Sequence, residues 1–257
     1  QYLDYLMFAL QTLSDDLATV SYRSVGKQLA PLIVRTRGHR LEGMWHAGSP
    51  MGMILNSLKG MLVLTPRNMV QASGMYNTLM SCTDPALIIE PLNAYRLKEK
   101  EPLNLGEFTV PLGKIEIINP GTDITVVSYG STLKLVEKTI PELERNNINI
   151  ELIDIQSLIP FDLNKDIVES IKKTNKLLIV DEDYPGGASS FILKVLIEDH
   201  NGFKYLDSKP ITLTAKEHRT PYGSDGDYFS KPSIDDIFEA CYRIMHEYNP
   251  KKYPRNY

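Results

Sequence analysis

The residues best suited to chemistry lie between Gly38 and Pro50, a segment without periodicity that holds three glycines, two histidines and the only tryptophan. An irregular segment of this length is typical of a functional loop. Because imidazole titrates near neutral pH, it can donate and accept a proton within one catalytic cycle. We predict His46 as the catalytic residue of this loop; a surface histidine satisfied by solvent or a carbonyl is the alternative.

The composition is that of an ordinary globular protein. The 257 residues carry a net charge of −4, with 42% hydrophobic and 23% charged residues, which disfavours nucleic-acid or anionic-membrane partners. Apolar runs such as Lys176–Val180 are far shorter than the roughly 20 residues that span a bilayer. Two cysteines, Cys82 and Cys241, fit a reducing compartment, so we expect a cytoplasmic protein. Because the chain begins at Gln1 without a Met or a signal segment, we expect a piece of a longer polypeptide.

Helical and strand patterns alternate along the chain, which predicts an α/β fold with parallel strands and right-handed crossovers. The expected helices cover residues 5–22, 67–81, 132–145, 163–173, 188–199 and 233–248, and the expected strands cover 31–35, 61–64, 86–90, 124–129, 148–155, 176–181 and 211–214. A stretch rich in charge, Pro and Gly divides the chain into a first domain at 1–97, a linker at 98–122 and a second domain at 123–257. Both domains are expected to be doubly wound, with ligands at the carboxyl ends of the strands.

Three stretches of the chain carry a family resemblance. They are Glu107–Lys114 (EFTVPLGK), Asp123–Gly130 (DITVVSYG) and Glu151–Asp162 (ELIDIQSLIPFD). Together they resemble the beta subunit of the thiamine-diphosphate-dependent 2-oxo acid dehydrogenases, over nearly the whole chain. The resemblance implies an N-terminally truncated, partial transketolase-type pyrimidine-binding domain followed by a transketolase C-terminal-type domain.

The resemblance assigns roles to two residues. His46, in the run Trp45–Pro50 (WHAGSP), matches a family histidine that lines the active-site channel and is assigned proton transfer or engagement of the lipoyl group. Ala47 and Gly48 replace the polar pair that usually orients this histidine. Tyr5 matches an aromatic residue that contacts the aminopyrimidine ring of the cofactor; core packing at a helix start is the alternative.

A turn before the strand at 86–90 matches a cation site of several family members. There, main-chain carbonyls and an acidic or amide side chain bind a structural monovalent cation such as K⁺. The corresponding residues are Leu79, Cys82 and Asp84, with Cys82 standing where an Asp is often found, so retention and loss of the site are both open. The acidic run Asp181–Asp183 likewise matches a strand end that shapes a subunit contact.

By the same resemblance, the complete enzyme decarboxylates a branched-chain 2-oxo acid or pyruvate with thiamine diphosphate and Mg²⁺, and acylates a lipoyl domain. The carboxylate that activates the cofactor and the Mg²⁺ site belong to segments outside this chain, so the fragment is expected to be inactive alone. The implied partners are an alpha subunit or alpha half, a second beta subunit, and the lipoyl and subunit-binding domains of the acyltransferase.

Two other functions stay open. The C-terminal part could be a non-catalytic docking or assembly module, with Asp235, Asp236 and Glu239 facing a basic partner.

A transketolase or deoxyxylulose-phosphate synthase relative would instead need a basic cluster for a sugar phosphate. The run Arg37–Arg40 (RGHR) is the candidate; its side chains could otherwise hold a carboxylate or, as we favour, be solvated charges.

Overall fold

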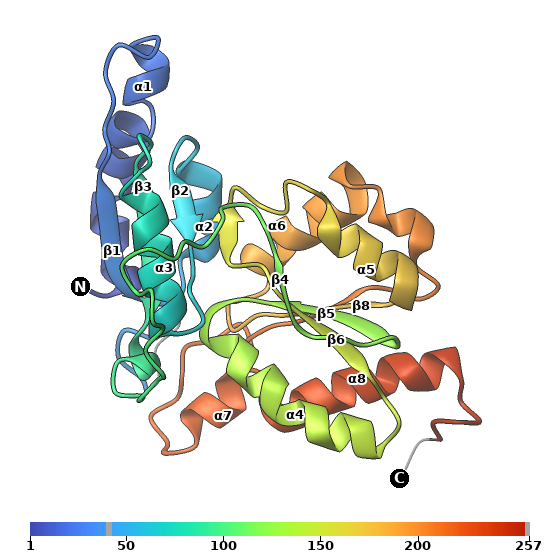
Figure 1. Ribbon diagram of the computed structural model, residues 1–257. Helices are drawn as coiled ribbons and strands as arrows, with labels where there is room; N and C mark the ends of the chain where they lie inside the picture. Colours follow the sequence, from blue (N-terminus) through green and yellow to red (C-terminus); the bar gives the residue numbers. More distant parts are fainter. Residues whose placement is uncertain (40–42, 255–257) are drawn as a thin grey trace.

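The computed structural model describes residues 1–39 and 43–254 and contains two β-sheets with helices on both faces (Figure 1). The first sheet has the order β1-β3-β2-β7, and the second has the order β4-β6-β5-β8-β9. The strands are β1 (Ile33–Gly38), β2 (Leu62–Leu64), β3 (Ala86–Pro91), β4 (Glu116–Asn119), β5 (Ile124–Ser128), β6 (Ile150–Asp154), β7 (Ser157–Ile159), β8 (Leu177–Val180) and β9 (Ile211–Leu213). Pairing is parallel except where β7 meets β2 and β4 meets β6. The predicted α/β fold is confirmed.

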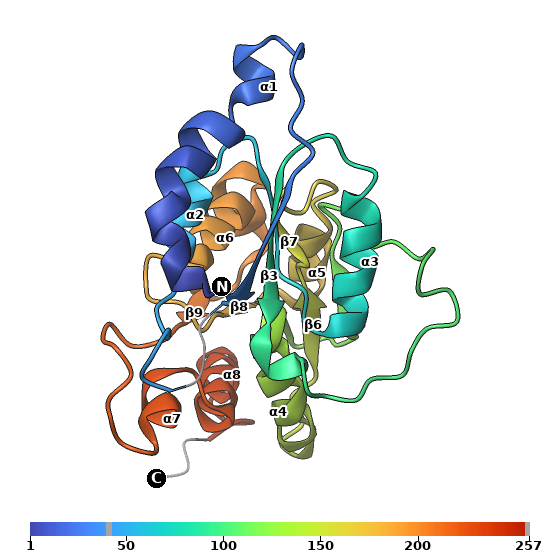
Figure 2. The ribbon, with the colours of Figure 1, turned by 90° about the vertical axis from the view of Figure 1, so that its left-hand side faces the viewer.

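Helices cover both faces of each sheet. In Figure 2, α2 and α3 lie on opposite sides of the first sheet, and in Figure 1, α5 and α6 lie on one side of the second sheet with α4 and α8 on the other. The helices are α1 (Val20–Arg23), α2 (Met51–Ser57), α3 (Met69–Leu79), α4 (Leu133–Arg145), α5 (Asp166–Thr174), α6 (Ala188–Lys194), α7 (Gly226–Ser230) and α8 (Ile234–Tyr248), with shorter 3-10 or π turns η1 (Leu3–Ala9), η2 (Thr12–Leu17), η3 (Leu92–Ala94), η4 (Gly130–Thr132), η5 (Val195–Asp199) and η6 (Gly202–Tyr205). Within the described ranges, no helix is both long and apolar enough to cross a membrane.

The last helix shows why the sequence folds as predicted. Ser233 accepts a hydrogen bond from the backbone N–H of Asp236 at 3.1 Å, and the Asp236 carboxylate accepts one from the N–H of Ser233 at 2.8 Å. This reciprocal capping box satisfies donors that the first turn of a helix leaves unpaired. Ile237, Cys241 and Ile244 then recur at helical spacing and are buried in the core shared with α4.

The structure departs from the sequence-based expectations in four places. The helix expected over 5–22 is divided into η1, η2 and α1, and α2 is an additional helix directly after the loop that ends at Pro50. β4 lies inside the stretch expected as a linker, and β7, from the second domain, pairs with β2 of the first. Apolar alternation marks a strand but carries no information on its direction or its partner sheet, so these pairings followed from no local pattern.

The two sheets share a hydrophobic core. One face of the second sheet, including Val126 and Leu178, packs against α4 and α8. The other face, including Val127, belongs to a cluster that also contains Leu3 and Ile54 of the N-terminal part. Burying strands on both faces is the usual state of parallel sheets covered by helices. The two predicted domains are therefore joined through side-chain packing as well as through the chain.

Gly60 is a position where this packing leaves no room for a side chain. Its φ is +107°, and a Cβ there would lie 2.1 Å from the carbonyl oxygen of Ala18. We expect Gly60→Ala to lower the free energy of unfolding by about 2 kcal/mol or more, because both the backbone conformation and the contact oppose a side chain. Urea unfolding followed by circular dichroism measures the change.

Gly106 provides the matched control, because a Cβ there would have no heavy atom within 4 Å. Gly106→Ala is expected to change the free energy of unfolding by no more than about 0.5 kcal/mol. Equal losses in the two variants would contradict the steric explanation for Gly60.

Candidate active site

His46 and Tyr5, the two residues assigned to the active site from the sequence, lie next to each other. The His46 ring stacks on Tyr2 with ring centroids 4.2 Å apart and planes at 7°, and it meets Tyr5 edge-on at 4.8 Å. Tyr2 itself is placed by an isolated β-bridge to Arg37 in β1. Strand β1 thus holds the N-terminal residues against the loop that follows it.

Two charged side chains complete this group, which we call the His46 cluster (Tyr2, Asp4, Tyr5, Arg37 and His46). The Oδ2 atom of Asp4 lies 3.4 Å from Nδ1 of His46, within ion-pair range, and the guanidinium carbon of Arg37 lies 4.4 Å from the Tyr2 ring centroid. The His46 side chain is 28% exposed, and its Nε2 atom has no hydrogen-bond partner among the described residues. An imidazole oriented through Nδ1 and open at Nε2 can exchange a proton at Nε2 with a bound molecule.

The backbone of this loop is constrained at two points. His46 has a φ of +58°, a left-handed conformation that non-glycine residues adopt at a cost and that is frequent at functional sites. At Gly48, a Cβ would lie 2.5 Å from Nη1 of Arg219, which lies in the segment between β9 and α7. The family's polar residue is thus replaced by glycine where the Arg219 guanidinium approaches the loop.

A second network, buried behind the same loop, consists of His39, Ser49, Tyr129 and Asp181. Nδ1 of His39 lies 3.0 Å from the Ser49 hydroxyl, and Nε2 lies 3.0 Å from Oδ1 of Asp181. The Tyr129 hydroxyl lies 3.1 Å from Nε2 of His39 and donates to Oδ1 of Asp181 at 2.8 Å. The backbone N–H of Ser189 donates to the other carboxylate oxygen of Asp181 at 3.0 Å. This His39 network connects the end of β1 to the residues that follow β5 and β8.

The electrostatic balance of the His39 network favours a charged imidazolium. His39 is only 3% exposed, and this burial lowers its pKa. The hydrogen bond and negative charge of Asp181, helped by Glu182 and Asp183, outweigh burial, so the pKa of His39 is raised above its usual 6.5. Burial, together with the nearby carboxylates, raises the pKa of the Tyr129 phenol, which therefore stays a hydrogen-bond donor.

Our interpretation of the Arg37–Arg40 run as solvated charges is wrong for His39, which is buried and paired with Asp181. Arg37 contacts the Tyr2 ring and the carbonyl of Gln1, and Arg40 lies outside the described residues. Asp181 lies just past β8, whose carboxyl end the fold brings next to the end of β1. The burial of a loop histidine is decided by tertiary packing, which no local pattern encodes.

The predicted cation turn lies between α3 and β3. The carbonyl of Leu79 accepts the backbone N–H of Cys82 at 3.0 Å, and the Cys82 thiol contacts the carbonyl of Thr78 at 3.3 Å. Burial and the nearby charge of Asp84 raise the pKa of Cys82, so this sulfur is a protonated thiol at neutral pH. In residues 1–39 and 43–254, no three His, Cys, Asp or Glu side chains are grouped so as to hold a metal ion.

Two of the three acidic residues proposed for docking, Asp235 and Asp236, have local structural contacts, and the third, Glu239, is exposed. Asp236 is engaged in the capping box with Ser233, and Asp235 accepts a hydrogen bond from the Tyr228 hydroxyl at 2.5 Å. A carboxylate committed to a helix cap gives up part of its capacity to bind a partner. The structure therefore offers no specific support for the docking-module function.

Comparisons with known proteins identify a matching family and a similar fold. Residues 113–229 match the family described as "Transketolase, C-terminal domain". A solved structure described as "Split gene transketolase, inactive beta4 tetramer" superposes with a TM-score of 0.73 over 95% of this chain and 74% of its own, at 16% sequence identity. At this identity the likeness concerns the fold, which is that of a transketolase-like protein.

Curated relatives narrow this class. The pyruvate dehydrogenase E1 component subunit beta of Chlorokybus atmophyticus is 31% identical over 238 residues, covering 92% of this chain and 70% of the relative. That of Acholeplasma laidlawii is 29% identical, covering 86% and 66%, and the 2-oxoisovalerate dehydrogenase subunit beta of Bacillus subtilis (strain 168) is 27% identical, covering 78% and 61%.

The chain belongs to this family of 2-oxo acid dehydrogenase E1 beta subunits. It spans from about half to about three quarters of the length of these and other curated relatives, from 52% to 74%.

The raised pKa of His39 leads to a pH-dependent stability. A histidine whose pKa is higher in the folded state contributes stability that is complete below its unfolded pKa of 6.5 and is lost as the pH rises through the folded value. We expect the free energy of unfolding to fall above pH 6.5, by up to about 1.4 kcal/mol per pH unit, and His39→Gln to remove this dependence. Urea titrations from about pH 5.5 to about pH 8.5 measure it.

His39→Ala tests the charge pairing directly, because it leaves the Asp181 carboxylate buried without its partner. We expect a loss of about 3 kcal/mol below pH 6.5, larger than that of His39→Gln, which keeps a hydrogen-bonding side chain. His246→Gln is the control, since His246 contacts the carbonyl of Tyr253, just beyond the end of α8, at 2.7 Å. An unchanged pH profile in His39→Gln would show that His39 is not the titrating group.

Proposed function

We propose that this chain forms the beta-subunit wall of a thiamine-diphosphate site in the decarboxylating component of a 2-oxo acid dehydrogenase. The observation that carries the proposal is the contact between Tyr5 and His46, two side chains that the family resemblance assigns to cofactor and catalysis from separate parts of the sequence. The family membership of the chain supports the same reaction class. The oxo acid is a branched-chain 2-oxo acid or pyruvate, since relatives carry both names.

The residues present fit such a cofactor. Tyr5 is 48% exposed and offers its ring as a platform for the aminopyrimidine. Oδ1 of Asp4 is buried and unpaired among the described residues, a state that is costly unless a further donor arrives. Thiamine diphosphate, when bound, supplies the electron sink that decarboxylation of a 2-oxo acid requires.

The roles of the chain's own side chains follow from these positions. Asp4 faces Nδ1 of His46 and favours the tautomer that carries a proton there. Nε2 of His46 then holds or accepts the proton exchanged with the substrate or the lipoyl group. The Tyr2 ring, stacked on His46, fixes the imidazole plane. No described group of side chains can hold Mg²⁺, and the proposal assigns the Mg²⁺–diphosphate contacts to a partner chain.

Partner subunits are part of this proposal. The N-terminal turns and the segment before β1 expose large apolar side chains, among them Phe8 at 91%, Tyr22 at 88% and Val25 at 86%. Large exposed apolar side chains on successive segments indicate a surface that another chain covers. We propose an alpha subunit or alpha half and a second beta subunit as the chains that do so. The lipoyl and subunit-binding domains of the acyltransferase complete the set of partners.

The turn between α3 and β3 is proposed to bind K⁺. The Asp84 carboxylate is exposed and forms no ion pair within the part of the chain that the structure describes, so it is available to a hard cation.

We expect K⁺, but not equal concentrations of tetramethylammonium, to raise the melting temperature of the assembled protein. Asp84→Ala should remove that increase, while Asp199→Ala, which removes a carboxylate at the end of η5, should keep it.

An activity measurement tests the cofactor and catalytic roles. In an assembly with its alpha portion, we expect thiamine-diphosphate-dependent turnover of pyruvate or 2-oxoisovalerate. His46→Ala should lower kcat by about 100-fold or more, because general acid–base groups contribute that much. Tyr5→Ala should weaken cofactor binding by roughly tenfold, the value of one aromatic contact.

Two variants on α8 serve as controls, His246→Ala and Tyr248→Ala, which remove the same side-chain types from the second domain far from the His46 cluster. Both should retain activity. The proposal fails if a cofactor-loaded assembly turns over neither oxo acid, or if His46→Ala matches the wild type in kcat.

A further inference from the structure

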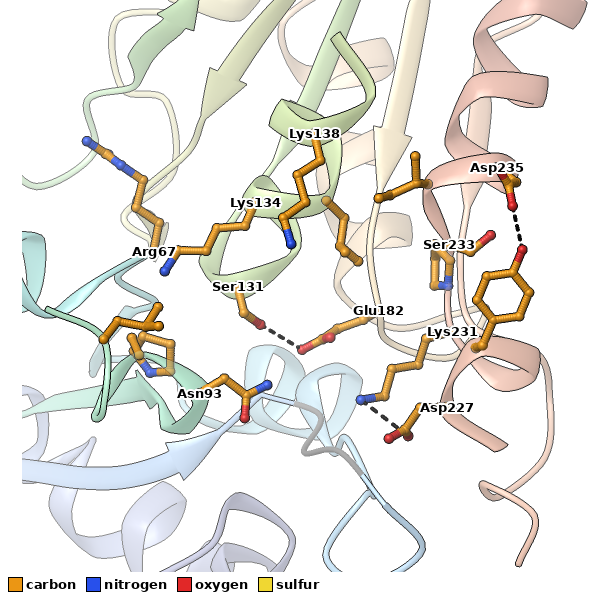
Figure 3. A pocket seen from close by; sticks show the side chains of 17 residues that line it. Arg67, Asn93, Ser131, Lys134, Lys138, Glu182, Asp227, Lys231, Ser233 and Asp235 are labelled. Atoms are coloured by element: carbon orange, nitrogen blue, oxygen red, sulfur yellow. Dashed lines mark hydrogen bonds and ion pairs between the residues drawn. The ribbon is translucent and has the colours of Figure 1, made fainter. Parts of the chain in front are cut away.

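A cavity of about 680 Å³ lies between the two domains and contains no residue of the His46 cluster. Small-molecule sites commonly have volumes of about 300 to 1,000 Å³, so this cavity is large enough for a small organic ligand. Its walls come from the segment after β3, the start of α4, the residue Glu182 after β8, and the α7–α8 segment (Figure 3).

The cavity occupies the position where the topology of the second sheet predicts a ligand. From β5 the chain moves to β6 on one side, and it later returns to place β8 on the other side of β5. In open α/β sheets, the crevice outside the carboxyl ends of two such strands is the preferred ligand position. Ser131, just past β5, and Glu182, just past β8, both line the cavity.

Two lysines on α4 direct positive charge into this space. Lys134 and Lys138 are one helical turn apart, so they project from the same face, and Figure 3 shows both side chains reaching into the cavity. Among the residues that the structure describes, neither amine has a hydrogen-bond or ion-pair partner. Like charges at this spacing repel each other, and a bound anion would relieve that repulsion.

The other cationic groups in the wall are already engaged. Arg67 donates to Glu116 and Asp154 at 2.7 Å each, and the amine of Lys231 lies 3.6 Å from Asp227. Lys134 and Lys138 are therefore the cations of this wall without an ion-pair partner among the described residues, while the Glu182 carboxylate of the same wall accepts the Ser131 hydroxyl at 3.2 Å.

Besides the polar side chains of Asn93, Ser233 and Asp235, the remaining lining includes the apolar residues Pro91, Leu97, Leu135 and Ile234. We propose that the cavity binds a small organic anion, whose carboxylate or phosphate contacts Lys134 and Lys138 and whose apolar body packs against these side chains. Such a division, with an apolar lining and a few converging polar groups, is the usual design of a ligand pocket.

Ligand-observed saturation-transfer NMR on the full-length protein in its assembly tests the proposal with three probes that share one ring. Phenyl phosphate and 3-phenylpropanoate carry the two anionic groups, and benzyl alcohol carries none. We expect saturation transfer to at least one anionic probe and weaker binding of the alcohol. The tighter of the two anions identifies the natural anionic group.

The double variant Lys134→Met/Lys138→Met keeps the aliphatic stems and removes the charge. It should weaken binding of the anionic probe by roughly tenfold or more, because hydrogen bonds to charged groups contribute this much. Lys204→Met/Lys209→Met removes the same charge from the segment between η5 and β9 and should bind as the wild type does. Both replaced pairs lie at the surface, and melting curves verify that each variant is folded.

Three results would overturn the proposal. They are the absence of binding by both anions, benzyl alcohol binding as tightly as the anions, and equal affinity in the wild type and the Lys134→Met/Lys138→Met variant. Because none of these residues belongs to the His46 cluster, the outcome is independent of the decarboxylation assay.

Discussion

A buried carboxylate needs a positive partner where the two halves of this chain meet, and His39 supplies it. Asp181 is fully buried, and without the imidazolium it would leave an uncompensated charge in the interior, which costs several kcal/mol. The same imidazole contacts Ser49 through its other nitrogen, three residues beyond His46. One side chain therefore neutralises the end of β8 and holds the loop that carries the proposed catalytic histidine. Arg67, which bridges from the start of α3 to Asp154 at the end of β6, ties the halves together at a second point.

Packing makes this junction rigid. β7 adds a strand from the second half to the first sheet, and the hydrophobic cluster beneath it runs through both halves. Backbones also approach closely, since a Cβ on Gly52 of α2 would lie 3.3 Å from the carbonyl of Gly186. Close-packed interiors resist small displacements, so the position of the His46 loop relative to the second sheet is set by many contacts together.

What could be predicted from the sequence was mostly what local pattern encodes. The helix expected over 233–248 and most strands of both sheets followed from the alternation of helical and strand patterns along the chain. The family resemblance implied that Tyr5 and His46 belong to one site, whereas no periodicity in the sequence indicated it. The antiparallel strands β4 and β7 depend on pairing at long range, for which a local window holds no signal. Asp4, an acidic residue two positions from the chain's first tyrosine, was indistinguishable from a solvated charge until the fold placed it against His46.

The end of β8 lies between the buried His39 network and the cavity lined by Lys134 and Lys138. Successive residues of an extended segment point to opposite sides, and Asp181 is still bonded to β9 through its backbone N–H. Asp181 accordingly faces the buried His39 network, whereas Glu182 faces the cavity. The Ser131 hydroxyl donates to Glu182 at 3.2 Å, so the residues just beyond β5 support this wall from the cavity side. Because Asp181 also accepts the N–H of Ser189 and the hydroxyl of Tyr129, the strand end is held from within the second domain. The strand end thus separates the buried pair of His39 and Asp181 from the cavity, so the two sites keep separate sets of partners.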